Sequence, residues 1–512
     1  MTGIDYDLCV IGGGINGAGI ARDAAGRGLK VLLIEAGDLG GATSSASTKL
    51  IHGGLRYLEY YEFKLVRESL KERELLLSLA PHVIWPLEFV LTHTPEQRPT
   101  WMIRVGLFFY DHLAKRKKLS GSRALNLKKD ERGQFIDDRY KRAFSYEDCW
   151  ADDSRLVVLN AVSAAQKGAT ILTQHKCVKL KHDDDCWLVS YKQDTPKAET
   201  QTIKASMVIN AAGPWVRDLL DGSKISQDES KLPNVRLVKG SHIIVKRQYK
   251  GEQAYILQQP DRRITFAIPY EKDYTLIGTT EEDYEGNPKD AMISDDEMAY
   301  LVEAYNRFFE KPISKSDVMW TYSGVRPLYD EGEADATSAT RDYKLHMHLG
   351  YAAPMISVFG GKLTTYRKLA EAAVDKILHL GNRNAAPWTA LARPGDELPG
   401  GDIANADFDT FLAQQGQRYK WLPKALLYRY ARSYGTCMDV FLQGASGLKD
   451  LGNDFGDHVY EAEIVYLLRY EYAKTAEDIL WRRSKLGLHV SDTTVKKVDA
   501  YIKQYWKDRK DG

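Results

Sequence analysis

A glycine-rich turn near the start of the chain has the spacing of a dinucleotide-binding loop. Gly12, Gly14 and Gly17 stand as G-x-G-x-x-G directly after the apolar run 8–11. In such a loop the first glycine permits a tight turn and the second lets a pyrophosphate approach the backbone. The third lets the following helix pack closely against the strand. The chemistry that this pattern favours is the binding of a dinucleotide.

An acidic residue follows at the distance that this interpretation requires. "KVLLIE" predicts a second strand, and Glu35 ends it. A carboxylate at that point binds the hydroxyls of a ribose and disfavours a 2′-phosphate. The strand, the glycines, the helix, the second strand and the acid together favour a bound dinucleotide over a βα turn without a ligand.

Two later glycine-containing stretches favour a flavin over a nicotinamide. "VINAAGPW" (208–215) is an apolar strand that ends in small residues, and "FGGKLTTYRKL" (359–369) is a glycine turn that opens a helix. A helix N-terminus offers unpaired N–H groups and a partial positive charge, which would stabilise an anionic reduced flavin. An ordinary βα junction explains either stretch alone. The three stretches together favour flavin adenine dinucleotide, FAD.

Composition excludes several other classes of protein. The 512 residues carry a formal net charge of +1, which argues against general binding to nucleic acid. The five cysteines include no pair at CxxC spacing, so we expect neither a metal site nor a disulfide framework. No uncharged apolar run approaches the roughly 20 residues of a membrane span. The nucleotide-binding strand begins within the first ten residues, so we expect no signal peptide.

The elements that must position these residues fall into three regions of α/β, α+β and helical character. Alternating strand and helix patterns predict a discontinuous FAD-binding domain, and antiparallel strand patterns such as "HIIVKR" and "RITFAIPY" predict a mixed substrate domain. After the linker "RPGDELPGGD", patterns such as "EAEIVYLLRYEYAKTAEDILWRR" predict helices. The expected bounds are 1–80, 150–230 and 345–385 for the first domain, 81–149 and 231–344 for the second, and 400–512 for the third.

Several motifs resemble one family along nearly the whole chain, in the same order. They include "ATSSASTKLIHGGLRYLE", "INAAGPWV", "KGSHIIV", "IGTTEEDYEG", "WTYSGVRPL" and "FGGKLTTYRKLAE". Together they resemble the aerobic, FAD-dependent glycerol-3-phosphate dehydrogenases. The resemblance implies a FAD-binding domain of glutathione-reductase type, a substrate domain with a mixed antiparallel sheet, and a helical C-terminal domain.

The same resemblance implies the activity and the location. The enzyme would oxidise sn-glycerol 3-phosphate to dihydroxyacetone phosphate, with hydride transfer to FAD and electron transfer to ubiquinone or menaquinone. It would be cytoplasmic and peripherally bound to the inner face of the cell membrane. A homo-oligomer is expected, although no residue pattern specifies its size. Three alternatives remain: a glycerol-phosphate oxidase that uses oxygen, an amine or amino-acid oxidase, and a protein that keeps FAD for structure alone.

Arginine is the residue best suited to bind the substrate phosphate, because its planar guanidinium can donate hydrogen bonds to two oxygens at once. In the family motifs the candidates are Arg56, Arg326 and Arg341, with Tyr57 beside the first. Lys362, at the glycine turn before the last helix of the FAD-binding region, would add charge there or face the flavin. Without the motifs, each arginine would be assigned to the surface.

The proton acceptor is sought among the histidines, which titrate near neutral pH. His52 in "LIHGG" and His242 in "KGSHIIV" lie inside the matching motifs. We assign His242 to the substrate and, with Arg326, to catalysis, and His52 to the cofactor. An arginine that lowers the pKa of the substrate hydroxyl is the alternative to a histidine base.

The expected cofactor contacts gather in five short stretches. The residues are Gly12, Gly14, Ile15, Asn16, Gly17, Glu35, Ala36, Thr43, Ser44, Ser47, Lys49, Leu50, His52, Gly53, Ala212, Gly213, Gly361, Lys362, Leu363, Thr364 and Thr365.

One segment suits a membrane surface. Residues 101–118, "WMIRVGLFFYDHLAKRKK", place bulky apolar side chains beside four consecutive cations. Such a pairing suits an interface with anionic lipid. A buried helix that ends in a solvated basic turn explains the same letters, and the two interpretations stay open.

Overall fold

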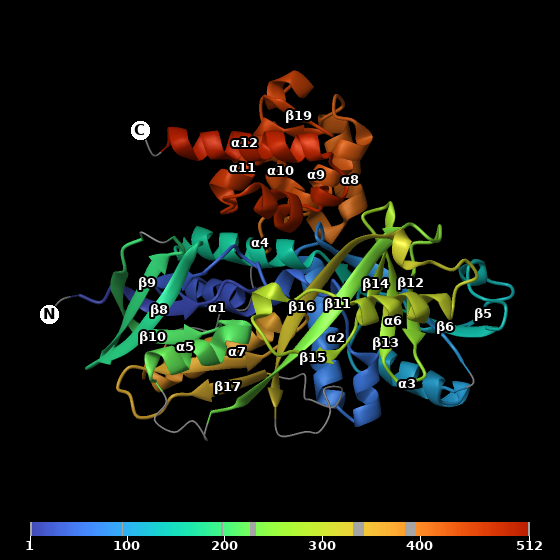
Figure 1. Cartoon of the computed structure of the whole chain (residues 1–512), viewed down its shortest axis with the longest axis horizontal. Helices are drawn as coiled ribbons and strands as arrows, with labels where there is room; N and C mark the ends of the chain where they lie inside the picture. The colour runs from blue at the N-terminus through green and yellow to red at the C-terminus, as the bar shows by residue number, and fades with distance from the viewer. Residues whose placement is uncertain are drawn as a thin grey trace.

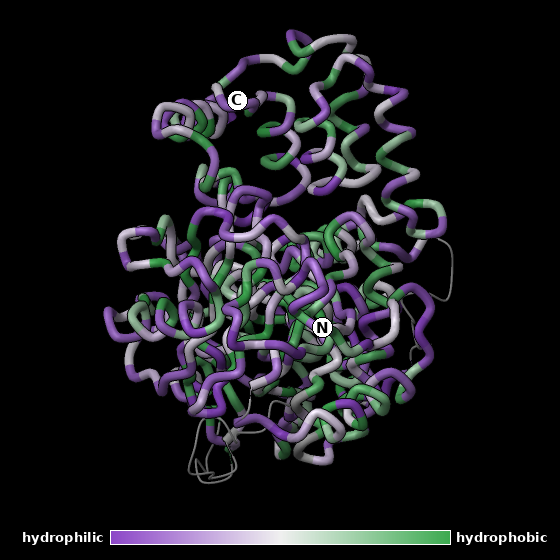
Figure 2. Tube along the Cα trace, turned by 90° about the vertical axis from the view of Figure 1, so that its right-hand side faces the viewer, coloured by the Kyte–Doolittle hydropathy of each residue, from purple (hydrophilic) through white to green (hydrophobic). Residues whose placement is uncertain are grey.

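The computed structural model describes residues 3–94, 96–195, 198–225, 232–330, 343–384 and 395–509 (Figure 1). Two sheets lie side by side in a larger body, and a helical part formed by residues 395–509 sits across them. Apolar residues gather in the interior of the larger body (Figure 2). This arrangement confirms the predicted fold class of mixed sheets with a helical C-terminal part.

The first sheet carries the glycine-rich turn. Among the described residues it has eight strands in the order β17-β18-β10-β1-β2-β7, and β9 and β8 extend it beyond β10. β1, β2, β10 and β18 run parallel, and Leu8 to Val10 are fully buried, as strands covered on both faces must be. The bounds are β1 (Tyr6–Ile11), β2 (Val31–Ile34), β7 (Thr170–Leu172), β8 (His175–Asp183), β9 (Cys186–Gln193), β10 (Gln201–Asn210), β17 (Tyr343–Met347) and β18 (Met355–Gly360).

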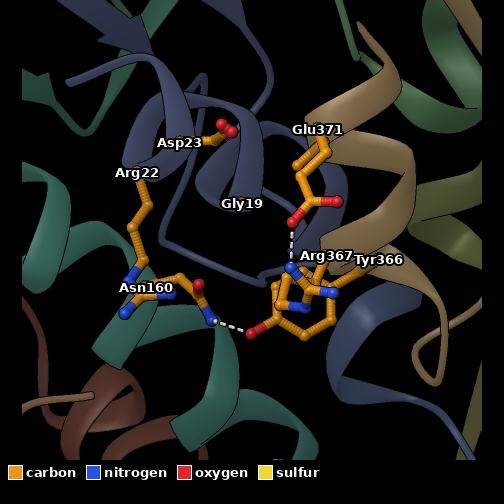
Figure 3. Close-up of a pocket in the computed structure, with 8 residues that line it drawn as sticks. Gly19, Arg22, Asp23, Asn160, Tyr366, Arg367 and Glu371 are labelled. Carbon is orange, nitrogen blue, oxygen red and sulfur yellow. Dashed lines mark hydrogen bonds and ion pairs between the residues drawn. The ribbon is translucent and has the colours of Figure 1, made fainter. Parts of the chain in front are cut away.

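Three helices pack together beside this sheet: α1 (Ile15–Gly26), α4 (Asp153–Gln166) and α7 (Tyr366–Leu380). Their junction holds a small polar pocket, where the Asn160 amide donates to the Tyr366 hydroxyl at 3.0 Å (Figure 3). Gly19 lets the helices approach, because a Cβ there would lie 2.8 Å from the Tyr366 ring. None of the lining residues is a predicted cofactor contact, so this pocket lies outside the candidate site.

The second sheet has ten strands among the described residues, in the order β15-β11-β14-β13-β12-β4-β6-β3, with β16 beside β11 and β5 beside β6. The long β11–β16 ladder places His242 opposite Tyr322, and Val238 opposite Arg326. The strand bounds are β3 (Leu50–Ile51), β4 (Ile84–Thr92), β5 (Arg123–Asn126), β6 (Arg142–Ala151), β11 (Asn234–Lys246), β12 (Ala254–Gln258), β13 (Ile264–Tyr270), β14 (Tyr274–Gly278), β15 (Glu282–Asp283) and β16 (Val318–Asp330).

The remaining helices of the larger body are α2 (Phe63–Leu79), α3 (Thr100–His112), α5 (Val216–Ser223) and α6 (Asp295–Asn306). The strands read from "HIIVKR" and "RITFAIPY" are confirmed as β11 and β13, and α6 lies in the same region of the chain. α6 begins at a capping box, in which Ser294 and Glu297 satisfy each other's backbone N–H groups. The region after Glu35 contains β3 and two 3₁₀ turns, η1 (Thr43–Ser45) and η2 (Leu55–Tyr60).

The C-terminal part contains the helices α8 (Phe408–Arg418), α9 (Lys424–Tyr434), α10 (Met438–Leu442), α11 (Glu461–Tyr470) and α12 (Asp492–Asp508). A π-helical turn, η11 (Asp478–Arg483), and the short strands β19 (Asp454–Gly456) and β20 (Val459–Tyr460) complete it. The helical pattern over 461–483 is confirmed as two helical segments, α11 and η11: α11 ends at Tyr470, and Tyr472 adopts a positive φ. At the break the Glu471 side chain is buried against Arg155 of α4.

The domain bounds at 80, 150, 230, 345 and 400 stay a prediction. No helix within the described ranges is both long and apolar enough to cross a bilayer.

Candidate functional site

The glycine-rich turn is built against the end of β10. Gly12 has φ +105°, and a Cβ there would lie 2.4 Å from the Ala211 carbonyl oxygen. At Gly17 a Cβ would meet the Gly12 carbonyl oxygen at 1.8 Å. The two glycines therefore allow the β1–α1 turn to lie directly against β10, whose continuation is Ala212–Gly213.

Glu35 lies at this turn. Its carboxylate accepts the Gly13 N–H at 2.6 Å and the Gly37 N–H at 2.7 Å. Burial raises the pKa of Glu35, and these two N–H groups lower it in part. An acid held against the glycine turn by backbone groups is fixed in position to accept ribose hydroxyls, and Ala36 follows it directly.

The first turn of α1 faces the stretch 43–44. Gly14 caps α1 without a side-chain hydrogen bond, and the Ile15 N–H donates to Ser44 Oγ at 3.0 Å. Thr43 Oγ1 donates to the Val325 carbonyl at 2.6 Å, next to Arg326. Thr43 and Ser44 thus lie between the helix N-terminus and the strand that carries Arg326.

The β18–α7 turn joins the same place. Gly360 and Gly361 have φ of +73° and +105°, and the Asn16 amide donates to the Gly360 carbonyl at 3.1 Å. Asn16 Oδ1 is buried, and the part of the chain that the structure describes offers it no hydrogen-bond partner. Thr364 Oγ1 accepts the His52 N–H at 3.3 Å, so the turn contacts the "LIHGG" stretch as well. Leu363 packs on the core, and Thr365 caps α7.

These features fit an extended dinucleotide. The ends of β1, β2, β10 and β18 meet at one edge, where ligands bind in open α/β sheets. The edge offers a glycine cradle that a Cβ would fill, a carboxylate beside it, two helix N-termini and the orphaned Asn16 oxygen. The site residues present can hold FAD. Among the described residues, no cluster of His, Cys, Asp and Glu has the makings of a metal site.

Ser47 and Lys49 are engaged by a residue that the sequence interpretation missed. Asp153, at the start of α4, accepts Ser47 Oγ at 2.7 Å and Lys49 Nζ at 2.9 Å. The ion pair is buried, and burial lowers the pKa of Lys49 although Asp153 acts to raise it. The two side chains therefore fix the 43–49 loop to α4.

Leu50 and Gly53 are held in the interior. Leu50 is buried on β3, and the Gly53 N–H donates to Tyr110 Oη at 2.8 Å. A Cβ at Gly53 would lie 2.4 Å from Leu70. Asp148 accepts from Tyr110 at 2.8 Å, and sequence reasoning had no signal for this partner because 95 residues separate it from Gly53.

His242 lies next to the 43–49 loop. The ring is 2 % exposed, stacks on Tyr322 at 4.7 Å between centroids, and has Nε2 3.0 Å from Thr48 Oγ1. Its Nδ1 is buried and has no hydrogen-bond partner among the described residues. Burial lowers the pKa of His242 well below 6.5, and Lys49 and Arg326 lower it further. The histidine is therefore neutral at physiological pH and lies within the field of two cations.

Arg326 lies on β16 with its guanidinium near the start of β15. One nitrogen is 3.1 Å from Glu281 Oε1, and another is 3.4 Å from the Thr280 carbonyl. The Arg326 side chain is 25 % exposed, so solvent reaches part of it. Gly240 of β11 lies beside it, since a Cβ there would be 3.1 Å from the guanidinium. Arg326 and His242 thus share the β11–β16 ladder.

The other predicted cations are placed less completely. Lys362 Nζ lies 4.1 Å above the Tyr57 ring, which brings these two predicted residues together. The Arg56 backbone belongs to η2, but the described part of the chain does not include its side chain. Arg341 lies outside the described residues.

Comparisons with known proteins agree with this geometry. The model of the family "FAD dependent oxidoreductase" matches residues 7–367, and "C-terminal domain of alpha-glycerophosphate oxidase" matches 396–507. The chain is 50 % identical over 486 residues to a D-erythritol 1-phosphate dehydrogenase from Brucella abortus, with 95 % of each chain covered. It is 46 % identical over 507 residues to the aerobic glycerol-3-phosphate dehydrogenase from Escherichia coli, with 98 % of each chain covered.

Among solved structures, the glycerol-3-phosphate dehydrogenase from Bacillus halodurans complexed with FAD matches with a TM-score of 0.73 and 26 % identity. The match covers 98 % of this chain and 94 % of that one. The resemblance drawn from the motifs is confirmed: the chain belongs to the FAD dependent oxidoreductases, among relatives that include the aerobic glycerol-3-phosphate dehydrogenases, and its cofactor is FAD.

Proposed function

We propose that this protein oxidises the C2 hydroxyl of sn-glycerol 3-phosphate to the ketone of dihydroxyacetone phosphate. The observation that carries the proposal is the shared ladder of Arg326 and His242, which lies next to the cofactor-facing loop 43–49. An anion anchor and a neutral imidazole beside a flavin site are what oxidation of a phosphorylated alcohol requires. Two relatives named as glycerol-3-phosphate dehydrogenases, from Escherichia coli and Pseudomonas aeruginosa, are 46 % and 47 % identical to the chain.

Arg326 binds the phosphate in this proposal. Its fork pairs with two phosphate oxygens, and Lys362 adds a second positive charge. The Glu281 carboxylate lies 3.1 Å from the guanidinium on one side. Arg56 and Arg341 are proposed as further phosphate ligands on the strength of their motifs.

His242 receives the proton of the C2 hydroxyl in this proposal. Thr48 engages Nε2, and Nδ1 is the nitrogen without a partner, so Nδ1 is the atom that accepts. The positive charges of Lys49 and Arg326 make a protonated ring short-lived and also favour ionisation of the hydroxyl. Bound FAD supplies the hydride acceptor. The residues of the five cofactor stretches would orient it, with Glu35 at the ribose.

Oxidation of D-erythritol 1-phosphate is a second candidate, favoured by the 50 % identical relative from Brucella abortus. That substrate keeps the phosphate and adds one hydroxylated carbon. The test is kcat/KM for both substrates with an artificial electron acceptor. A pocket that fits one of two substrates that differ by one carbon favours it in kcat/KM by about 10- to 200-fold. A higher kcat/KM for D-erythritol 1-phosphate would assign that ester, and not glycerol 3-phosphate, as the substrate.

We propose a membrane quinone as the electron acceptor. The support is the motif resemblance and the relatives named aerobic glycerol-3-phosphate dehydrogenase. The expected result is fast reduction of a short-chain ubiquinone analogue with little hydrogen peroxide. A stoichiometric yield of peroxide in air would instead assign the chain to the glycerol-phosphate oxidases. The structural neighbours that are glycine oxidases have identities of 16–17 % and support the fold alone.

We propose that α3 and the start of α2 form the membrane-facing surface at the inner face of the membrane. Trp101, Phe108 and Phe109 of α3 are 65 %, 56 % and 45 % exposed. The Phe63 ring lies 6.2 Å from that of Phe109, and the 80 % exposed Tyr61 lies 6.4 Å from Phe63. These rings form one apolar patch, and the cations 115–118 follow α3 directly. Apolar rings beside cations suit anionic lipid.

Sedimentation with vesicles tests this surface. We expect binding to vesicles that contain phosphatidylglycerol and weaker binding to phosphatidylcholine alone. Phe108→Ser combined with Trp101→Ser should lower the bound fraction strongly, whereas Met292→Ser, at an equally exposed position elsewhere, should not. Equal binding of both variants and the wild type would remove α3 from the membrane surface. The homo-oligomer stays a prediction, to be checked by light scattering.

A further inference from the structure

The end of η11 and the two residues after it carry three cations into the FAD-binding region. We call residues Trp481–Lys485 the clamp segment. Arg483 is 0 % exposed and meets Asp38 through two bonds of 2.5 and 2.7 Å, and Arg482 Nε reaches the same carboxylate at 2.5 Å. Two arginines thus converge on one acid, 445 residues away from Arg483 in sequence.

Asp38 belongs to the turn that places Glu35. The Glu35 carboxylate binds the N–H groups of Gly13 and Gly37, and the Gly40 N–H returns to the Gly13 carbonyl at 3.0 Å. Burial raises the pKa of Glu35, and the charge of Asp38 contributes to the rise. The arginines of the clamp segment therefore anchor, and electrically balance, the turn that faces the ribose.

Lys485 anchors a second cofactor-facing segment. Its ammonium donates to Ser154 Oγ at 2.6 Å and lies 3.5 Å from Asp152. The residue between them, Asp153, binds Lys49 and Ser47 of the 43–49 loop. One ion cluster therefore runs from the C-terminal domain through the start of α4 to the loop beside the flavin.

The charges of this cluster act on one another. Burial would raise the pKa of Asp152, but Lys485 and then Lys49 outweigh it, and the pKa is lowered. Beyond Lys49, the Tyr322 hydroxyl donates to the Ser47 carbonyl at 2.8 Å, and Thr48 meets His242. The cluster therefore ends at the residues proposed to bind the substrate.

The clamp segment also contacts the strand that carries Arg326. Trp481 stacks on Trp320 of β16 with 4.3 Å between ring centroids and 17° between planes. Four of the five residues of the clamp segment thus touch the turn after β2, the start of α4 or β16. The buried charges of the clamp segment meet the carboxylates behind two cofactor-facing segments.

We propose that the clamp segment positions the FAD site, so that docking of the C-terminal domain and binding of FAD are coupled. Lys485 and Arg482 are positioning residues: they touch neither cofactor nor substrate, and act through Asp152–Asp153 and Asp38. The coupling is reciprocal, because an interaction that raises FAD affinity when the C-terminal domain is docked must also strengthen docking when FAD binds.

The test compares FAD binding by apoprotein of the full chain in three variants. Lys485→Met and Arg482→Met each remove one contact of the clamp segment, and Arg483 remains with Asp38 in the second. Glu471→Gln is the matched control, since it weakens the buried side-chain pair between Arg155 and Glu471, which joins the same two parts, and keeps the Glu471 carbonyl that Arg483 binds. Circular dichroism and elution volume establish that each variant is folded.

We expect the dissociation constant of FAD to rise about 5- to 150-fold in Lys485→Met, the range of typical coupling between sites. Lys485→Arg should recover most of the loss. Glu471→Gln should lower the unfolding midpoint and leave FAD affinity unchanged. Hydrogen exchange of residues 481–485 should slow when FAD binds wild-type protein and should not slow in Lys485→Met.

Two results would overturn the proposal. In the first, Lys485→Met and Arg482→Met leave both the FAD affinity and the visible circular dichroism of the bound flavin unchanged. The clamp segment would then only hold the C-terminal domain in place, without an effect on the FAD site. An equal loss of FAD affinity in Glu471→Gln would mean that any loosening of the C-terminal domain has the same effect. Neither result depends on which polyol phosphate is the substrate, so the proposed function stands or falls separately.

Discussion

Two arginine–carboxylate pairs in this molecule look alike and are enclosed very differently. At the domain junction, Arg155 and Glu471 are 1 % and 0 % exposed and form a two-pronged pair. At the candidate substrate site, Arg326 is 25 % exposed and meets Glu281 through one oxygen at 3.1 Å. A sealed pair can only hold two parts together. The Arg326 side chain is partly exposed to solvent, which is compatible with our proposal that it binds the substrate phosphate.

The largest effect, on stability, is expected from breaking the buried pair of Arg155 and Glu471. Glu471→Gln leaves Arg155 charged, buried and without its ion partner, and breaking one side of a buried pair costs about 3–5 kcal/mol. The denaturant midpoint of the holoenzyme should fall accordingly. A midpoint within experimental error of the wild type would contradict the claim that this pair is sealed.

The next largest effect is expected at Arg326. Arg326→Ala should cost about 2–5 kcal/mol in kcat/KM for glycerol 3-phosphate, by analogy with broken charge pairs at interfaces. Arg326→Lys keeps the charge but loses the fork and should also be impaired. Glycerol lacks the phosphate, so its slow oxidation should change little, in protein verified to retain its flavin. Equal losses with both substrates would assign Arg326 to structure or to the flavin.

A pH effect is expected at the junction, where His82 is fully buried. Both ring nitrogens lack a partner among the described residues, and burial, Arg155 and Arg432 lower the pKa of His82 to about 3. Above pH 6.5 the ring is neutral in folded and unfolded chains. Below it the unfolded chain takes up a proton and the folded chain does not, so stability falls as pH falls from 6.5 towards 3.

The comparison variant is His82→Asn, which does not titrate. Between pH 7.5 and 5.0 the wild type should lose about 2 kcal/mol more stability than this variant, the value of 1.5 pH units below the unfolded pKa. Parallel losses in the two proteins would show that His82 is protonated in the folded state.

The smallest effect is expected when the charge of Glu281, the partner of Arg326, is removed. Removal of its charge takes one negative charge away from the site where a phosphate must bind. Glu281→Gln should therefore strengthen competitive inhibition by inorganic phosphate, by about 1 kcal/mol for a partly exposed pair. Weaker inhibition would mean that Glu281 is needed to hold Arg326 in its binding orientation.

The parts of the site that the sequence predicts are those in which partners lie close along the chain. The glycine turn and Glu35 are within 25 residues of each other, and their arrangement follows from strand and helix geometry alone. Arg326 and His242 were singled out by motif, and no local pattern places them on one ladder. The acids Asp153 and Asp38 were missed because their partners lie 104 and 445 residues away. The break between α11 and η11 has no local signal either, since Glu471 there pairs with Arg155, 316 residues away.

The most direct test of the central claim is anaerobic mixing of the oxidised holoenzyme with glycerol 3-phosphate while the flavin absorbance near ~450 nm is followed. We predict full bleaching within the time of catalytic turnover, slower bleaching with D-erythritol 1-phosphate, and almost none with glycerol at the same concentration. A flavin that neither phosphate ester bleaches, or that sarcosine or a D-amino acid bleaches instead, would contradict the assignment of this protein as a polyol-phosphate dehydrogenase.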